Sequence, residues 1–331
     1  MYHRRILIYA LTAILYLQAG AAEPKLWLDF KNAQKSGKES ILPDFSWAGY
    51  HYSEKAIPHI KRRVFKVTSY GAIPNDDKYD DKAVQKALKA AEVKGGGVVL
   101  FPPGRFKFCP KEGLEHGIQI TSSNIVLRGA GSGDKGTELF IDKMNTKNGS
   151  SYFLVAPPKA KSTKLATIVA SAKRESHVLK VNNSSALKVG QTVVIIYKGK
   201  DFVKRYFAPQ KASSNWTRLF EGGMSIHELH TIKSIRGKKV ILREPLHLDI
   251  QIQKDQDFEI RSFEMIEELG IEKLRFTGNW NDTNRDIWLK GKPREFVHHR
   301  EGDPIDDYAW EALRMRGVRN AWISDCEFKD L

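Results

Sequence analysis

Residues 67–108 read VTSYGAIPNDDKYDDKAVQKALKAAEVKGGGVVLFPPGRFKF and decide the fold. A helix is predicted in the middle of this stretch, because its apolar residues recur at i, i+3 and i+4 spacing. These residues are Ala83, Val84, Ala87, Leu88 and Ala91. Asp80 or Asp81 can cap the start of the helix. Gly95–Gly97 ends it, since glycine accepts the left-handed backbone that a C-cap needs.

A short strand flanks this helix on each side. Phe65 and Val67 lead into Gly71, where the chain must bend sharply. Residues 98–101, Val-Val-Leu-Phe, predict a short buried strand, which the turn Pro102-Pro103-Gly104 closes. The order of elements is therefore strand, turn, helix, turn, strand.

This ordered combination resembles the N-terminal motif of the pectate-lyase superfamily of right-handed parallel β-helices. The superfamily includes rhamnogalacturonases, polygalacturonases and tailspike-like proteins. The matching residues are Gly71-Ala72, Asn75-Asp76, Asp80-Asp81, Ala83, Gln85, Ala87, Gly95–Gly97 and Phe101–Gly104. The resemblance implies an all-β right-handed parallel β-helix, a solenoid whose first coil is covered by this helix as a cap. It says little about the reaction, because lyases, hydrolases, epimerases and non-catalytic proteins share the motif.

Further strands follow the cap at uneven spacing. The first coils are predicted to continue through residues 117–120, 124–129 and 137–141. Residues 160–260 change pattern and indicate a β-rich insertion, a small barrel or sandwich, with a hairpin turn at residues 236–239. Within it, residues 198–218 are expected to form a loop. The β-helix resumes at residue 261, with one coil strand in residues 269–278 and two strands, separated by a turn at Gly317, in residues 310–328.

The N-terminus has the features of a signal peptide. Arg4 and Arg5 precede an apolar run from Ile6 to Leu17. Residues 18–22, Gln-Ala-Gly-Ala-Ala, supply the small residues that a signal peptidase prefers, with cleavage near Ala22. The run is shorter than a membrane span, although an uncleaved N-terminal anchor is the alternative. We therefore expect a secreted, periplasmic or cell-surface protein with no stable membrane span after cleavage.

The expected organisation has five parts. A signal peptide (1–22) precedes a flanking segment (23–63), which is expected to pack along the outside of the first coils through residues 42–52. The cap and first coils (64–159), the insertion (160–260) and the continued β-helix (261–331) follow. Because the chain stops just after a coil strand with no capping element, we expect it to be the N-terminal portion of a longer protein.

The composition favours an anionic partner. The formal net charge is +15, and 41% of the residues are hydrophobic, which excludes a disordered chain. Acidic polysaccharide, a membrane surface and nucleic acid are the classes to weigh; export and the absence of a DNA-binding motif disfavour nucleic acid. The alternative is that surface lysines only confer solubility. Cys109 and Cys326 either pair as one disulfide or stay free as small buried hydrophobes.

The densest group of reactive side chains lies in residues 296–310. Its candidate catalytic residues are His298, His299, Arg300, Asp303, Asp306 and Asp307. A lyase needs a base for the proton beside a uronate carboxylate and a cation for the developing charge. His298 or His299 can be the base, and Arg300 or Arg314 can be the cation. A hydrolase needs two carboxyls, and the aspartates offer them. Carboxylates can also bind Ca²⁺, whereas adjacent histidines disfavour zinc. A purely structural polar loop remains an alternative.

Basic and aromatic residues predict sugar contacts outside this group. The candidate substrate-binding residues are Lys204, Arg205, Trp216, Trp280, Trp310 and Arg314, because cations pair with carboxylates and flat rings stack on sugar faces. Together with the resemblance, these residues imply an exported polysaccharide lyase that cleaves an acidic polysaccharide by β-elimination. The alternatives are a hydrolase of the rhamnogalacturonase or polygalacturonase type and a non-catalytic polysaccharide-binding β-helix.

Overall fold

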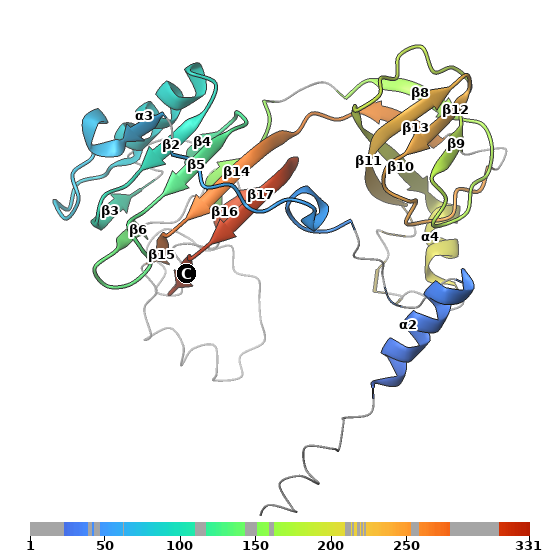
Figure 1. The fold of residues 1–331 in the computed structure, drawn as a ribbon, viewed down its shortest axis with the longest axis horizontal. Coiled ribbons are helices and arrows are strands. Elements are labelled where there is room, and N and C mark those ends of the chain that lie inside the picture. Colours follow the sequence, from blue (N-terminus) through green and yellow to red (C-terminus); the bar gives the residue numbers. More distant parts are fainter. Residues whose placement is uncertain are drawn as a thin grey trace, which may run out of the picture. The chain divides into compact units, whose positions relative to one another are not determined.

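The protein is a right-handed parallel β-helix into which an antiparallel barrel is inserted (Figure 1). The computed structural model describes residues 23–38, 42, 47–61, 63–109, 117–142, 151–158, 162–208, 213, 215–216, 219, 221, 223–252, 258–278 and 311–331. Residues 1–48 form one compact unit and residues 49–331 another. Within the first unit, helix α2 (Lys25–Ser36), which the sequence did not predict, ends at Gly37 in the left-handed conformation.

Three stacks of parallel strands build the β-helix. Sheet A contains β1 (Val64–Lys66), β2 (Gly97–Leu100), β5 (Ile125–Arg128), β14 (Ile266–Glu272) and β17 (Val318–Ser324). Sheet B contains β3 (Gly104–Phe108), β6 (Thr137–Ile141), β15 (Arg275–Gly278) and β18 (Glu327–Lys329). Sheet C contains β4 (Ile118–Ile120), β7 (Ser151–Val155) and β16 (Glu311–Met315). The chain visits the sheets in the order A, B, C and then returns to A, which confirms the predicted fold class.

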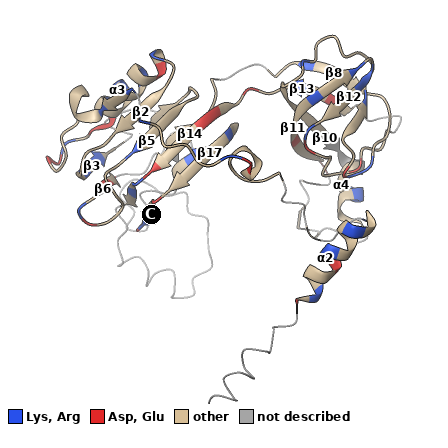
Figure 2. Ribbon diagram, in the orientation of Figure 1, with Lys and Arg blue, Asp and Glu red and all other residues tan. Residues whose placement is uncertain are grey.

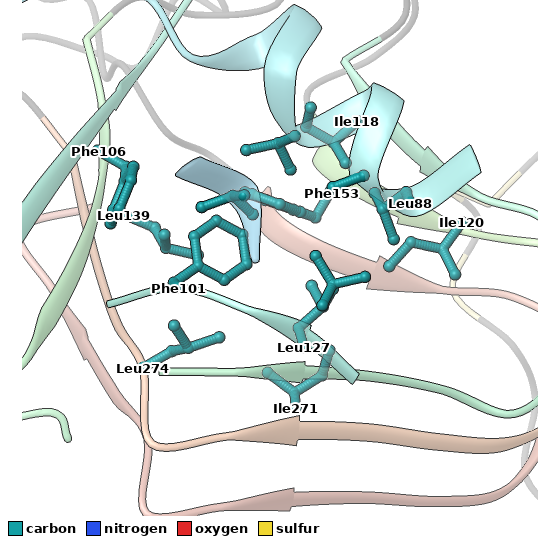
Figure 3. Close-up of a cluster of buried hydrophobic side chains, with 14 of the residues drawn as sticks. Leu88, Phe101, Phe106, Ile118, Ile120, Leu127, Leu139, Phe153, Ile271 and Leu274 are labelled. Carbon is teal, nitrogen blue, oxygen red and sulfur yellow. The ribbon is translucent and has the colours of Figure 1, made fainter. Parts of the chain in front are cut away.

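The inward side chains of the three sheets form one apolar core (Figure 3). Phe101, Phe106, Leu127 and Ile271 are fully buried there. Because β-strand side chains alternate between two faces, each coil contributes every second residue to this core. The coils therefore stack side chain on side chain along the solenoid.

Helix α3 (Asp81–Val93) closes the first end of the core, as the sequence predicted. Its apolar face is buried, and Gly71 (φ 103°) turns the chain after the short helix η2 (Val67–Tyr70). Asp80 is the N-cap residue of α3, as the sequence allowed, but its side chain makes no capping hydrogen bond. The Asp80 and Asp81 side chains instead accept hydrogen bonds from strand β3 and the chain around it.

Asp80 and Asp81 attach the cap to the first coil. The Asp80 carboxylate accepts the backbone N–H groups of Ile73 and Lys107, both at 3.1 Å. Asp81 accepts the Cys109 N–H at 3.2 Å and the hydroxyl of Tyr152. Burial raises the pKa of each aspartate to about 6. Both aspartates are thus structural, as the sequence indicated, and they join the cap to the first coil.

The flanking segment contacts the outer face of sheet A (Figure 1). The short helix η1 (Tyr50–Ser53) places Tyr50 against Trp322 of β17, with ring centroids 5.4 Å apart. Tyr50 and Ile60 also pack on Val98 and Val126. Part of the outer face of sheet A is therefore covered by the chain itself.

The insertion is a small antiparallel barrel. Its strands are β8 (Lys164–Ile168), β9 (Val178–Lys180), β10 (Thr192–Gly199), β11 (Met224–Arg236), β12 (Lys239–Leu242) and β13 (Phe258–Ser262). They pair in the order β8-β13-β10-β11-β12-β9, and a bridge between Ile168 and Val181 joins the two ends of that order. The predicted hairpin turn lies at Gly237. The barrel has a core of its own, distinct from that of the β-helix.

Three local predictions are wrong. Residues 200–207 form helix α4 (Lys200–Phe207) rather than a loop, because Phe202 and Val203 are buried on the barrel. Residues 269–278 belong to two strands, β14 and β15, which meet at a corner where Lys273 has φ 56°. Residues 310–328 contain parts of three strands rather than two. Cys109 and Cys326 are both free, which settles the alternative left open by the sequence.

Candidate functional site

The predicted catalytic residues lie on a connection between sheets B and C. His298, His299, Arg300, Asp303, Asp306, Asp307, Trp280 and Trp310 all fall in residues 279–310, outside the described residues. The structure does fix where this connection starts and ends. It leaves sheet B after Gly278 and enters sheet C at Glu311.

This edge of the β-helix collects equivalent connections from successive coils. In the first coil the chain passes from Phe108 to Ile118, and in the second from Ile141 to Ser151. The third connection, residues 279–310, is much longer than these two. Long loops on a rigid scaffold are where functional residues concentrate. The described residues beside this edge are therefore further candidates for a functional role.

One such group comprises Tyr79, Lys107 and Asp142. The Tyr79 hydroxyl donates a hydrogen bond of 2.8 Å to Oδ2 of Asp142, which directly follows β6. Nζ of Lys107 lies 3.7 Å from the same oxygen and 5.4 Å from the centroid of the Tyr79 ring. The side chains of Lys107 and Asp142 are 25% and 16% exposed. A tyrosine hydroxyl ordinarily carries its proton at neutral pH, so Tyr79 is a candidate general acid when the hydroxyl turns from Asp142 to a substrate oxygen.

Sequence reasoning missed this group. Tyr79 lies inside the cap motif, whose polar residues were expected to be structural, and Asp142 ends a strand of ordinary pattern. The usable signal was topological, because strands β3 and β6 are parallel neighbours and end at the same edge. Tyr79 joins that edge through a parallel bridge to Lys107.

Arg314, a predicted substrate-binding residue, lies on β16 in sheet C. It pairs in register with Leu154, which in turn pairs with Gln119 of β4. The guanidinium forms an ion pair with Glu311 of the same strand, and this partner raises the pKa of Arg314. Arg314 is thus three residues from the end of the long connection, and its substrate contact remains a prediction.

The other described candidates lie on the barrel. Lys204 and Arg205 are on helix α4, and Trp216 follows it. Of the predicted substrate-binding residues that the structure describes, Arg314 is on the β-helix and the other three are on the barrel. Figure 2 shows Lys and Arg on both regions.

The barrel interior contains a polar pair that the sequence analysis did not single out. Glu228 and His230 point inward from β11 and are 7% and 1% exposed. Nε2 of His230 lies 3.1 Å from Oε2 of Glu228, and its Nδ1 lies 3.3 Å from the Glu244 carbonyl. A carbonyl only accepts, so Nδ1 is the donor in its contact with Glu244. Oε2 of Glu228 also accepts the His247 N–H at 3.1 Å.

Two general features of the described part of the chain bear on function. No group of three or more His, Cys, Asp or Glu side chains there could hold a metal ion. The predicted Ca²⁺ site belongs to residues 298–307, outside that part. None of the helices that the structure describes is both long enough and apolar enough to cross a membrane.

Stretches of the chain are similar to enzymes from Azotobacter vinelandii. Mannuronan C5-epimerase AlgE3 is 30% identical over 121 residues, which is 36% of this chain and 6% of the relative. Mannuronan C5-epimerase AlgE1 is 29% identical over 121 residues, covering 36% of this chain and 8% of the relative. Alginate lyase 7 is 37% identical over 71 residues, 21% of this chain and 8% of the relative. The matches thus span less than a tenth of each relative, and no family model matches the chain.

Solved structures with a similar fold include phage tailspikes. The tailspike gp61 of Pseudomonas phage phi297 matches with a TM-score of 0.48 and 12% identity, over 81% of this chain and 38% of that chain. The gp54 tailspike of Acinetobacter baumannii bacteriophage AP22, solved with capsular saccharide, gives 0.42 and 14%, over 80% and 36%. The chain is a right-handed β-helix distantly related to the mannuronan C5-epimerases and the alginate lyase.

Proposed function

We propose that the protein acts on an acidic, uronate-containing polysaccharide, as a lyase that cleaves by β-elimination. The observation that carries the proposal is the sequence similarity to an alginate lyase and to C5-epimerases of mannuronan. The net charge of +15 supports an anionic substrate. Export through residues 1–22 is part of the same proposal, because such polymers lie outside the cell, and fractionation of cells that express the full chain tests it.

Elimination needs three functions at one sugar. A base removes the proton from the carbon beside the carboxylate, a cation stabilises the charge that develops, and an acid protonates the departing glycosidic oxygen. We assign the base to His298 or His299 and the cation to Arg300 or Arg314. Tyr79 is the proposed acid, because its hydroxyl carries a proton and lies with Asp142 at the edge where the long connection leaves sheet B.

A second candidate is C5-epimerisation, favoured by the similarity to several mannuronan C5-epimerases. Both reactions begin by removal of the same proton, and they differ in the second step. A lyase expels the glycosidic oxygen, whereas an epimerase returns a proton to the opposite face of the sugar. Hydrolysis would instead use two carboxyls among Asp303, Asp306 and Asp307, and polysaccharide binding without catalysis would need none of these groups.

One experiment in D₂O separates these activities. The protein is incubated with polymannuronate and other polyuronates while ultraviolet absorbance, reducing ends and deuterium incorporation are followed together. We expect absorbing unsaturated ends and reducing ends. Deuterium at C5 without new ends would indicate an epimerase, reducing ends without absorbance a hydrolase, and no change with retained binding a non-catalytic module.

A variant locates the chemistry within the chain. We expect His299→Ala to abolish cleavage without unfolding the protein. His227→Ala is the matched control, because His227 is exposed on β11 of the barrel and has no proposed part in the reaction. Full activity of both the His299→Ala and the His298→Ala variant would remove the 298–307 group from consideration.

A further inference from the structure

Aromatic rings form a continuous series from the barrel core to its surface. Neighbouring ring centroids are 5.4–5.9 Å apart along the series Tyr197, Phe202, Tyr206, Phe207 and Trp216. Tyr197 is fully buried, whereas Tyr206 and Trp216 at the outer end are 48% and 50% exposed. Tyr206 and Trp216 are thus two half-exposed rings that both contact Phe207, and the series links them to the barrel core.

Local contacts hold the outer rings in place. Helix α4 is anchored by Phe202 and Val203, which are 5% and 0% exposed. Trp216 lies in a turn in which its N–H donates to the Ser213 carbonyl at 3.0 Å, and its own carbonyl accepts the Leu219 N–H at 3.0 Å. Rings fixed by packing lose little entropy when a ligand binds, which favours binding.

Positive charge accompanies the exposed rings. Lys204 is exposed and Arg205 is partly exposed on the same helix as Tyr206 (Figure 2). A sugar acid presents an apolar ring face together with a carboxylate. Aromatic faces stack on the first, and Lys or Arg pairs with the second. The combination is complementary to an acidic sugar chain in both shape and charge.

We propose that Lys204, Arg205, Tyr206 and Trp216 form a binding platform for an acidic polysaccharide, the α4 platform, on the inserted barrel. This inference rests on the proposed function and deepens it. The platform holds the polymer and takes no part in the reaction, which is assigned to groups on the β-helix. Loss of the platform should therefore weaken binding and raise KM, and leave kcat unchanged.

Binding to polymannuronate, measured by affinity electrophoresis and calorimetry, tests the platform. The double variants Tyr206→Ala/Trp216→Ala and Lys204→Ala/Arg205→Ala should each bind about tenfold more weakly or worse. Trp27→Ala is the control for an exposed tryptophan, since Trp27 on α2 is 45% exposed. Lys233→Ala controls for an exposed cation on the barrel strand β11. Both controls should bind like the unchanged protein.

A carboxyl-reduced, neutral form of the polymer defines the ligand class. We expect it to bind at least tenfold more weakly than the acidic form to the unchanged protein, and charge removal from α4 should abolish that preference. Equal binding of both polymers would overturn the acidic ligand. Circular dichroism verifies the fold of each variant, and the charge variant removes no buried side chain.

The results separate this inference from the proposed function. If the unchanged protein turns over the polymer and both platform variants keep its affinity and KM, the α4 platform is wrong and the proposed function stands. If the unchanged protein neither binds nor alters any uronate polymer, the proposed function itself fails, and the platform with it. Loss of affinity and a higher KM in the variants, with an unchanged kcat, supports both.

Discussion

The β-helix and the inserted barrel bury their side chains in different ways. In the β-helix, Phe153 of β7 meets Phe276 of β15 edge to face across the core at 5.7 Å, and Phe276 stacks on Phe328 of the next coil at 4.9 Å. The barrel instead closes on itself and contains the inward pair Glu228 and His230. A stacked core depends on the shape of each neighbour, whereas the barrel interior also depends on an electrostatic match. The two regions should therefore fail under different perturbations.

The outer face of the β-helix differs from its apolar core, because charged residues meet there between neighbouring coils. On sheet B, residues of opposite charge pair in register across four strands, in the order Arg105, Glu138, Arg275 and Glu327. Exposed pairs of this kind contribute little stability each. They do match each coil to the next, because a shift of register by one residue would place Arg105 beside Thr137 or Leu139 instead of Glu138.

The largest effect is expected in the stacked core. Phe153→Ala removes a fully buried ring that contacts Phe108, Tyr152 and Phe276, and should destabilise the β-helix by about 3–5 kcal/mol. Because the barrel has a separate core, its amide protection should stay unchanged. Hydrogen exchange read peptide by peptide measures both regions. The reciprocal variant Phe258→Ala should affect the barrel alone, and equal loss in both regions would show that they unfold as one.

The next effect tests the polar pair of the barrel. His230→Leu removes the histidine from buried Glu228, which still accepts the His247 N–H, and should cost about 3 kcal/mol in the barrel, with little change in the β-helix. The double variant Glu228→Leu/His230→Leu removes both groups and should recover much of that loss. Denaturation of the single and double variants measures the coupling. A double variant that is less stable than His230→Leu would mean that the pair supports the barrel through other contacts.

Most of the fold was predictable because its signals are local. The helix in residues 81–93 follows from apolar spacing, and the strand after Gly97 from an apolar run between glycine and proline. Helix α4 was missed because Phe202 and Val203, the buried residues among those whose burial is described, are adjacent and give no extended period. The corner at Lys273 was missed because a residue other than glycine adopts φ 56° there, where the sequence offers no mark.

The candidate site was less predictable, because it depends on which segments meet. Tyr79 and Asp142 lie far apart in sequence, and only the parallel register of β3 and β6 brings them to one edge. Likewise, the order of hydrophobic and polar residues on β11 gave no reason to expect Glu228 inside a barrel. Arg314, in contrast, was singled out by its charge beside a long polar stretch, and that signal needs no tertiary contact.

Acidification should affect the two regions in opposite directions. Burial raises the pKa of Asp80 and Asp81 to about 6 from an ordinary 3.8, so the folded cap binds protons more tightly than the unfolded chain. Stability of the β-helix should rise by on the order of 2 kcal/mol for each aspartate as the pH falls from 7 towards 4. Asp80→Asn/Asp81→Asn should remove most of this slope.

The barrel supplies the opposite sign. Asp249 has a pKa below its ordinary 3.8, because it accepts the Arg174 N–H and pairs with Lys173, and Glu259 has a pKa below its ordinary 4.5 beside Arg261. Their contribution is complete above the ordinary values and is lost as the pH falls through the lowered ones. The barrel should therefore weaken below about pH 4. Denaturation midpoints of the two regions, followed from pH 7 to below pH 4, measure the rise for the β-helix and the fall for the barrel. The same pH dependence in both regions would contradict the prediction.

The smallest effect concerns how the cap meets sheet C. The Gln85 side chain of α3 accepts the Gln119 N–H at 2.9 Å and donates to the Gln119 carbonyl at 3.0 Å. One side chain therefore pairs with both backbone polar groups of Gln119 in β4. Gln85→Ala should destabilise the β-helix by about 1 kcal/mol, since both groups lose a partner at a half-buried edge. Lys86→Ala, on the exposed side of the same helix, is the matched control and should leave the midpoint unchanged. If the Gln85 variant is as stable as the control, β4 is held by stacking on β7 alone, and the cap serves only to exclude water from the first coil.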